Sequence, residues 1–114
     1  MKIINKPISK KELKEMAEKM YGNLVKAVVD IEKKIMAIDA DLHADEEHLL
    51  IENGSDQKDL WGINLYPDLD GEDFVEFDSM INLRPSQNNR TRGVDDPKVR
   101  KIIVGIVNKI VKNN

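Results

Sequence analysis

Arginine is unevenly distributed in this chain. Three of the four arginines lie in the polar stretch LRPSQNNRTRG, residues 83–93, whereas fourteen lysines and Arg100 carry the positive charge elsewhere. A guanidinium presents a rigid fork that can bind a carboxylate or a phosphate through two hydrogen bonds, which an ammonium cannot do. The stretch therefore predicts a loop that binds an anionic small molecule or an anionic protein partner through Arg84, Arg90, Arg92, Asn88 and Asn89.

The same arginines also have a purely structural interpretation. Residues 39–78 hold fourteen acidic side chains and a single basic one, Lys58. Arginines that paired with these acids would fix a long loop in place without any ligand. The sequence leaves both interpretations open.

Further polar groups are expected beside this loop. LWGINLY (60–66) and DFVEFDSMINL (73–83) have the alternation of strands, and a hairpin between them would place Asn64 near Asp78 and Asn82. These three side chains are therefore expected to shape the pocket. On the second strand, alternation directs a different set of side chains to the core: Val75, Phe77, Ile81 and Leu83.

A second group of residues suggests metal chemistry. The spacing Asp39-x-Asp41-x-His43 offers carboxylate oxygens and an imidazole, which are ligands for Mg²⁺ or Mn²⁺. One hypothesis is thus a divalent-metal-dependent hydrolase with Asp41 and His43 among the ligands and Glu76 or Asp78 as the base. The alternative is that these acids form the solvated start of a helix, where the helix dipole favours negative charge.

Specific catalytic signatures are missing from the sequence. There is no cysteine, which excludes disulfides, thiolate metal sites and a cysteine nucleophile. There is also no glycine-rich phosphate loop, no GxSxG and no HExxH. The sequence therefore leaves open whether the protein is an enzyme.

Charge is segregated along the chain. The acidic segment 39–78 lies between two basic segments, although the net charge is only −3. A phosphate backbone would meet repulsion as well as attraction, which argues against general nucleic-acid binding. Such a pattern also suits a protein-interaction module, for example an antitoxin-like partner or a self-associating chain. The sequence does not indicate the oligomeric state.

The elements that would position these groups follow from periodicity and capping. A capping box at Ser9 and Glu12 predicts a helix over 10–21. Asp96 and Pro97 predict the start of a final helix that continues to Val111. The remaining elements are strands over 24–31 and 34–40, a helix over 41–54, and the two strands described above. The order αββαββα predicts one α+β domain over residues 1–114, with about four strands in an antiparallel or mixed sheet and helices mainly on one face.

Composition agrees with a small folded domain outside the membrane. The 114 residues are 40% hydrophobic and 34% charged, and only 4% are aromatic, so the core is expected to be aliphatic. No apolar run approaches the roughly 20 residues that a membrane span needs. No apolar stretch of signal-peptide length follows the N-terminus. We therefore expect a cytoplasmic protein.

Two strings, LWGINLYP and EFDSMINLRP, carry a resemblance that covers approximately residues 25–110. They resemble a short prokaryotic family that is catalogued only as a domain of unknown function. The resemblance implies a prokaryotic protein. It implies no activity, cofactor or site residue.

Overall fold

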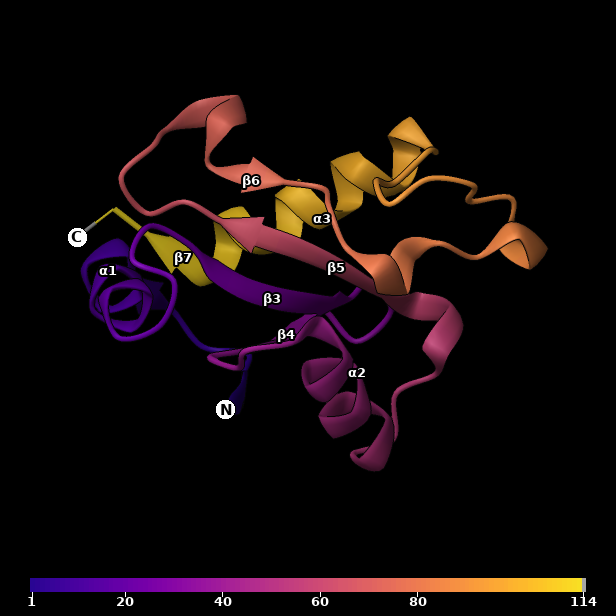
Figure 1. The fold of residues 1–114 in the computed structure, drawn as a ribbon, viewed down its shortest axis with the longest axis horizontal. Coiled ribbons are helices and arrows are strands. Elements are labelled where there is room, and N and C mark those ends of the chain that lie inside the picture. Colours follow the sequence, from indigo (N-terminus) through magenta and orange to yellow (C-terminus); the bar gives the residue numbers. More distant parts are fainter. Residues whose placement is uncertain (114) are drawn as a thin grey trace.

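A computed structural model describes residues 1–113. Within this range the chain forms one α+β domain with three α-helices (Figure 1). The predicted class, the order of the main elements and most of their positions are confirmed. The elements are β1 (Lys2–Ile4), β2 (Ile8–Ser9), α1 (Lys10–Glu18), β3 (Val25–Asp30), β4 (Ile35–Ile38), α2 (His43–Glu52), β5 (Leu60–Leu65), β6 (Val75–Glu76), α3 (Pro97–Ile110) and β7 (Val111–Lys112).

The main sheet of the described residues has five strands in the order β1-β4-β3-β5-β6, and every neighbouring pair is antiparallel. Its extra strand relative to the prediction is β1, which pairs with β4 at the edge. A second, smaller pairing joins β2 and β7 in parallel, with Ile8 opposite Val111. The segment before α1 is therefore held against the segment after α3.

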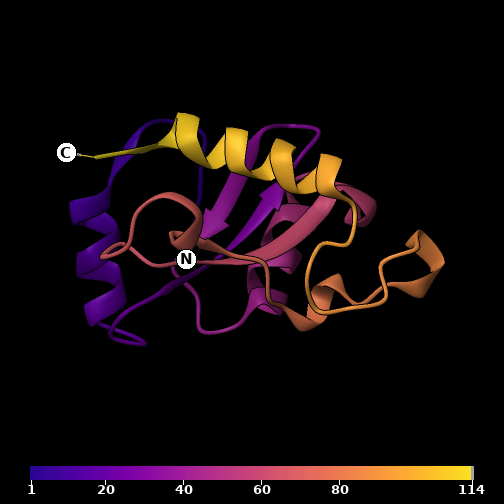
Figure 2. The same ribbon diagram turned by 90° about the horizontal axis from the view of Figure 1, so that it is seen from above.

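The helices lie on both faces of the sheet. α1 and α3 pack on one face, where Leu13 and Ile103 join side chains of the sheet such as Val29 and Ile63 in the main core. α2 covers part of the other face, where Leu50 contacts a smaller cluster that includes Val28. Figure 2 shows α3 running along its face of the sheet, with α1 at one end. Two of the three helices thus share a face, as predicted, and α2 lies opposite them.

The predicted helix starts are confirmed. The Ser9 side chain accepts a hydrogen bond from the Glu12 N–H at 3.1 Å, which is one half of the predicted capping box. The Glu12 carboxylate accepts from the Ser9 hydroxyl at 3.4 Å rather than from its backbone N–H. At α3, the Asp96 carboxylate accepts from the Lys98 N–H at 2.9 Å and Pro97 occupies the first turn.

None of the helices in residues 1–113 combines the length and the apolar character that a membrane crossing requires.

The predicted strand over 73–83 is correct only for β6: Asp73 ends a 3-10 turn over Gly71–Asp73, and the prediction is also wrong beyond Glu76. The chain leaves the sheet there and forms a short 3-10 turn over Met80–Asn82, with Ser79 capping the turn. Leu83, which alternation directs to the core, is 44% exposed. The physical reason is that the Asn82 side chain takes over the pairing with β5: its Oδ1 accepts from the Gly62 N–H at 2.8 Å, and its Nδ2 donates to the Gly62 carbonyl at 3.0 Å.

Gly62 permits this crossing because it lacks a side chain. A Cβ at position 62 would lie only 2.5 Å from the Cβ of Ser79. The segment after β6 can therefore cross directly over β5 and lead into the arginine loop, which we define as residues 83–93.

Candidate functional site

Asn89 holds the arginine loop together. Its buried amide donates to the backbone carbonyls of Asn82 at 2.7 Å and of Gly93 at 2.8 Å, and its Oδ1 accepts from the Asp95 N–H at 2.8 Å. Both ends of this side chain are used within the protein. Asn89 and Asn82 therefore shape the loop and have little capacity left for a ligand.

Arg84 also makes internal contacts. Its two terminal nitrogens donate to the carbonyls of Gln57 and Leu60, each at 2.6 Å, and its guanidinium lies 4.2 Å from the centre of the Trp61 ring. Burial lowers the pKa of Arg84 from its ordinary value. This arginine fastens the loop to the start of β5, which is close to the structural interpretation, although its partners are carbonyls rather than acids.

Asn88 lies at the tip of the loop, which the bridge between Arg84 and Asn89 closes, and Arg90 directly follows this bridge. The loop projects from one end of the sheet in Figure 1. Asn88 adopts a left-handed conformation with φ of 60° and ends a short 3-10 turn. The Arg90 backbone N–H donates to Asp95 at 2.7 Å, whereas its side chain is exposed and, among residues 1–113, has no carboxylate within 4 Å. The predicted site residues therefore do not converge on one place.

Three of the predicted residues do come together, on the face of the sheet opposite α3. Arg92 Nε donates to Asp78 Oδ1 at 2.7 Å, and the Asn64 amide lies 3.4 Å from the Asp78 carbonyl. Strand register adds two more side chains, because Lys26 of β3 is opposite Asn64 and Asn64 is opposite Glu76. Neighbouring strands are about 4.8 Å apart, so this row spans roughly 10 Å.

Asn64 is the centre of this row and is only 6% exposed. Its Nδ2 donates to Glu76 Oε1 at 2.8 Å, and the hydroxyl of Tyr66 donates to the same oxygen at 2.9 Å. A carboxylate can only accept, so the amide nitrogen must face Glu76 and the orientation of the amide is fixed. The opposite atom, Asn64 Oδ1, is buried and has no hydrogen-bond partner among residues 1–113.

His43 approaches the same region from α2. Its Nε2 lies 2.7 Å from the Ile63 carbonyl, which requires the proton to be on Nε2. Burial is the main cause that lowers the pKa of His43, and the positive charges of Lys26 and Arg92 lower it further. The hydrogen bond to the Ile63 carbonyl and the charge of Asp78 raise this pKa, but by less than burial lowers it. The ring is therefore neutral at pH 7. Figure 1 shows that no helix covers this face over β5 and β6, and we call the whole group the polar face: Lys26, His43, Asn64, Tyr66, Glu76, Asp78 and Arg92.

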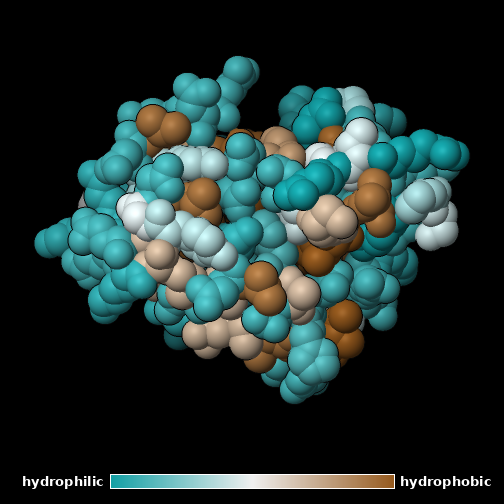
Figure 3. Space-filling model, in the orientation of Figure 1, coloured by the Kyte–Doolittle hydropathy of each residue, from teal (hydrophilic) through white to brown (hydrophobic). Residues whose placement is uncertain are grey.

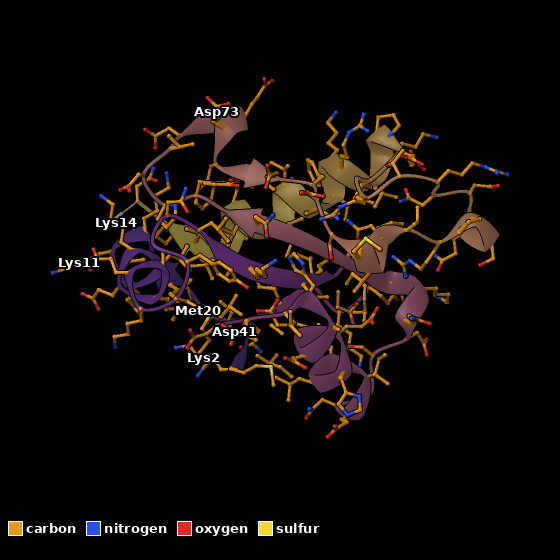
Figure 4. The ribbon with its side chains drawn as sticks, viewed as in Figure 1. Lys2, Lys11, Lys14, Met20, Asp41 and Asp73 are labelled. Carbon is orange, nitrogen blue, oxygen red and sulfur yellow. The ribbon has the colours of Figure 1, made fainter. Side chains whose placement is uncertain are left out.

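The predicted metal ligands, Asp41 and His43, make different contacts in the structure. His43 uses Nε2 for the sheet, whereas the Asp41 carbonyl accepts a hydrogen bond from the hydroxyl of Tyr21. Figure 4 shows Asp41 near Met20, between α1 and the start of α2, where both residues line a hollow of about 360 Å³. In the part of the chain that the structure describes, no group of three His, Asp or Glu side chains is arranged to hold a metal ion.

One buried acid was missed from the sequence. Glu46 is fully buried on α2, and neither carboxyl oxygen makes a well-formed hydrogen bond within residues 1–113. Burial raises its pKa to about 10, and the contact with the Ala40 backbone acts in the opposite direction. The carboxyl is therefore neutral at pH 7. The sequence did hold a signal, because Glu46 shares helical spacing with His43 and Leu50, which places it on the apolar side of α2. The solvated helix start offered as an alternative is therefore wrong for Glu46.

Taken together, the fold is a small α+β domain whose antiparallel sheet presents a polar face that α2 covers only in part. A family model described as "Protein of unknown function (DUF5674)" matches residues 2–110, and the chain belongs to this family. The resemblance carried by the two strings is thereby confirmed. Comparison with curated proteins gives no match. Comparison with solved structures gives none either.

Proposed function

We propose that this protein binds a small polar ligand on the polar face, and that the ligand carries both an anionic group and a hydrogen-bond donor. The observation that carries the proposal is the buried Oδ1 of Asn64, which has no partner among residues 1–113. Leaving a buried acceptor unpaired costs about 1–3 kcal/mol. A ligand that donates to this oxygen would recover that free energy.

The charges around Asn64 favour a ligand of mixed character. Lys26 and Arg92 supply positive charge, and Glu76 and Asp78 supply negative charge, all on the polar face. The Lys26 ammonium lies 5.2 Å from the centre of the Tyr21 ring rather than on Asn64 Oδ1. A zwitterion such as an amino acid could place its ammonium near Asn64 and Glu76 and its carboxylate near Lys26 or Arg92.

This proposal keeps the anionic ligand expected from the sequence, but its binding site is the polar face rather than the arginine loop. Asn64, Asp78 and Arg92 remain in the site, whereas Arg84, Asn82 and Asn89 support the loop. The metal-dependent hydrolase has no corresponding cluster in residues 1–113. No specific feature of the fold in residues 1–113 supports the function of an antitoxin-like interaction module.

A ligand screen tests the proposal. We expect one class among amino acids, hydroxy acids and sugar phosphates to raise the melting temperature, because a ligand that binds only the folded state stabilises it. Calorimetric titration of that compound into Asn64→Ala and Arg92→Ala should then show binding weakened about tenfold or more, which corresponds to roughly 1.4 kcal/mol per lost contact.

Arg90→Ala separates the polar face from the tip of the loop. It removes an exposed arginine of the same loop and should leave the titration unchanged. Loss of binding in Arg90→Ala, with binding retained in Asn64→Ala, would place the ligand at the loop tip and contradict the proposal. Failure of every compound to stabilise the wild type would also count against it.

A further inference from the structure

A groove lies between α3 and the segment that contains β6, on the face of the sheet opposite the polar face. Its volume is about 1290 Å³. Figure 3 shows a notch at this upper edge of the molecule, between two hydrophilic projections, with hydrophobic residues at its floor. Side chains alternate along β6, so Val75 lines the groove while Glu76 belongs to the polar face. The two sites are therefore separate, and we call this one the α3–β6 groove.

The lining of the α3–β6 groove combines polar and apolar side chains, and its apolar part is partly pre-formed. Its apolar members come from both walls: Phe74, Val75, Phe77, Val104 and Val111. Phe74 and Val75 are packed into the main core, which fixes their positions. The groove is large enough for one organic molecule, since typical ligand pockets have volumes of about 300–1,000 Å³.

The charges at the groove are unbalanced. On one side, Asp70 is paired with Lys10 at 2.7 Å, and the Lys10 ammonium also lies 4.4 Å from the centre of the Phe74 ring. On α3, Arg100 and Lys101 line the groove and have no carboxylate within ion-pair distance among the described residues. This leaves two unpaired cations against one acid, Glu72.

Arg100 is held in place by the backbone. One terminal nitrogen donates to the Val94 carbonyl at 2.7 Å, which fixes the guanidinium at the start of the groove. Its carbonyl contacts do not neutralise its charge, so it can still attract an anion. Lys101 is the next residue, is exposed, and supplies a second cation.

We propose that the α3–β6 groove binds an amphipathic carboxylate, with its hydrocarbon body against the two phenylalanines and valines and its headgroup at Arg100 and Lys101. The apolar side chains of the groove favour the hydrocarbon body of such a molecule, and the excess positive charge favours its carboxylate. An extended peptide added to the free edge of β6 fits less well. This strand has only two residues and offers few backbone hydrogen bonds.

The test is a titration of the full chain with a fluorescent fatty-acid analogue, 11-(dansylamino)undecanoic acid. We expect saturable binding of one molecule per chain, and displacement of the probe by decanoate. Acetate should not displace it, because it lacks the apolar body. Decanol should displace it at least about tenfold less effectively than decanoate, because it lacks the charge.

Two charge-reversal variants locate the headgroup. Lys101→Glu should weaken probe binding about tenfold or more. Lys109→Glu makes the same charge change on the same helix, but lies about 12 Å further along it and does not line the groove. Its effect should stay within about twofold at physiological salt, where charges are screened beyond roughly 8 Å. Both side chains are exposed, so both variants should fold.

Several outcomes would overturn the inference. These are failure of the probe to saturate a site, equal displacement by decanol and decanoate, or equal losses in Lys101→Glu and Lys109→Glu. Stronger displacement by acidic extended peptides than by decanoate would assign the groove to strand addition instead. A loss in Asn64→Ala as large as that in Lys101→Glu would place the probe on the polar face.

Discussion

The arginine loop and the polar face each contain buried asparagines, but they use them differently. In the loop, Asn89 uses both ends of its amide on backbone groups, and Asn82 does the same across to Gly62. On the polar face, Asn64 uses only its nitrogen, and its oxygen stays without a partner in residues 1–113. The same residue type thus completes the fold in one region and leaves an unpaired group in the other.

Among the buried asparagines, this difference distinguishes the structural residues from the candidate functional one. A buried polar group whose hydrogen bonds are all made within the chain stabilises one conformation. A buried group with an unused acceptor costs free energy in the folded protein and is a reason to look for a ligand. The comparison yields four predictions.

Among the alanine substitutions, the largest loss of stability is expected from Asn89→Ala. This change removes the amide that closes the loop and leaves the Asn82 and Gly93 carbonyls and the Asp95 N–H without their partner. We expect the free energy of unfolding to fall by about 3 kcal/mol. Urea denaturation followed by the fluorescence of Trp61, the only tryptophan, measures it.

Asn88→Gly is the matched control for this change. Asn88 is exposed and has a positive φ, which glycine adopts without strain. The control should change the unfolding free energy by less than about 0.5 kcal/mol. Equal effects of the two variants would show that Asn89 does not organise the loop.

Glu46 is a buried acid whose carboxyl oxygens, like Asn64 Oδ1, have no hydrogen-bond partner among residues 1–113. Its pKa is about 10 in the folded protein and near 4.5 without burial, so between these values the unfolded chain has released a proton that the folded chain keeps. The stabilisation is complete below about pH 4.5 and decreases as the pH rises toward 10, by up to about 1.4 kcal/mol per pH unit.

Glu46→Gln should remove this part of the pH dependence, because the amide does not titrate. Urea denaturation at several values between pH 6 and pH 9 gives the slope for each protein. The difference between the two slopes isolates Glu46 from other titrating groups. An unchanged slope in the variant would mean that Glu46 is ionised in the folded protein.

Asn64→Ala is expected to cost less than Asn89→Ala, about 1 kcal/mol. The change breaks the hydrogen bond to Glu76, but it also removes the buried oxygen that lacks a partner. Ligand-free protein must be used for the urea measurement. A loss as large as that of Asn89→Ala would indicate that Asn64 is also chiefly structural, and would weaken the proposed function.

Arg92→Ala should have the smallest effect on stability, below about 0.5 kcal/mol. Its ion pair with Asp78 is exposed, with 55% of the arginine side chain accessible, and such pairs contribute little. If the polar face binds a ligand, the same variant should nevertheless weaken that binding. A large loss of stability would instead assign Arg92 to the structural part of the loop.

Most of the fold could be predicted because local signals agreed with one another. The capping residues Ser9 and Asp96 mark the starts of two helices, and β-branched runs mark β3 and β4. The end of β6 could not be predicted. Residues 77–83 continue to alternate, but a side-chain amide from Asn82 replaces the backbone at Gly62, and this depends on a tertiary contact.

The site was predicted only in part, for a related reason. Alternation placed Asn64 on the polar side and the hairpin brought it to Asp78, as observed. The partners of Arg84 are backbone carbonyls of residues 57 and 60, which no sequence pattern marks as acceptors. Lys26 joined the row through the register of β3 with β5, which is set by the whole sheet.

The short parallel pairing of β2 with β7 has a consequence for how the chain folds. It joins Ile8 to Val111, so it closes almost the longest loop that the described chain allows. Closing a flexible loop of about 100 residues costs on the order of 4 kcal/mol of entropy, and two residue pairs do not offset this alone. The β2–β7 contact should therefore form only after the main sheet and α3 have folded. Its backbone amides should exchange with deuterium sooner than those of β3 and β5.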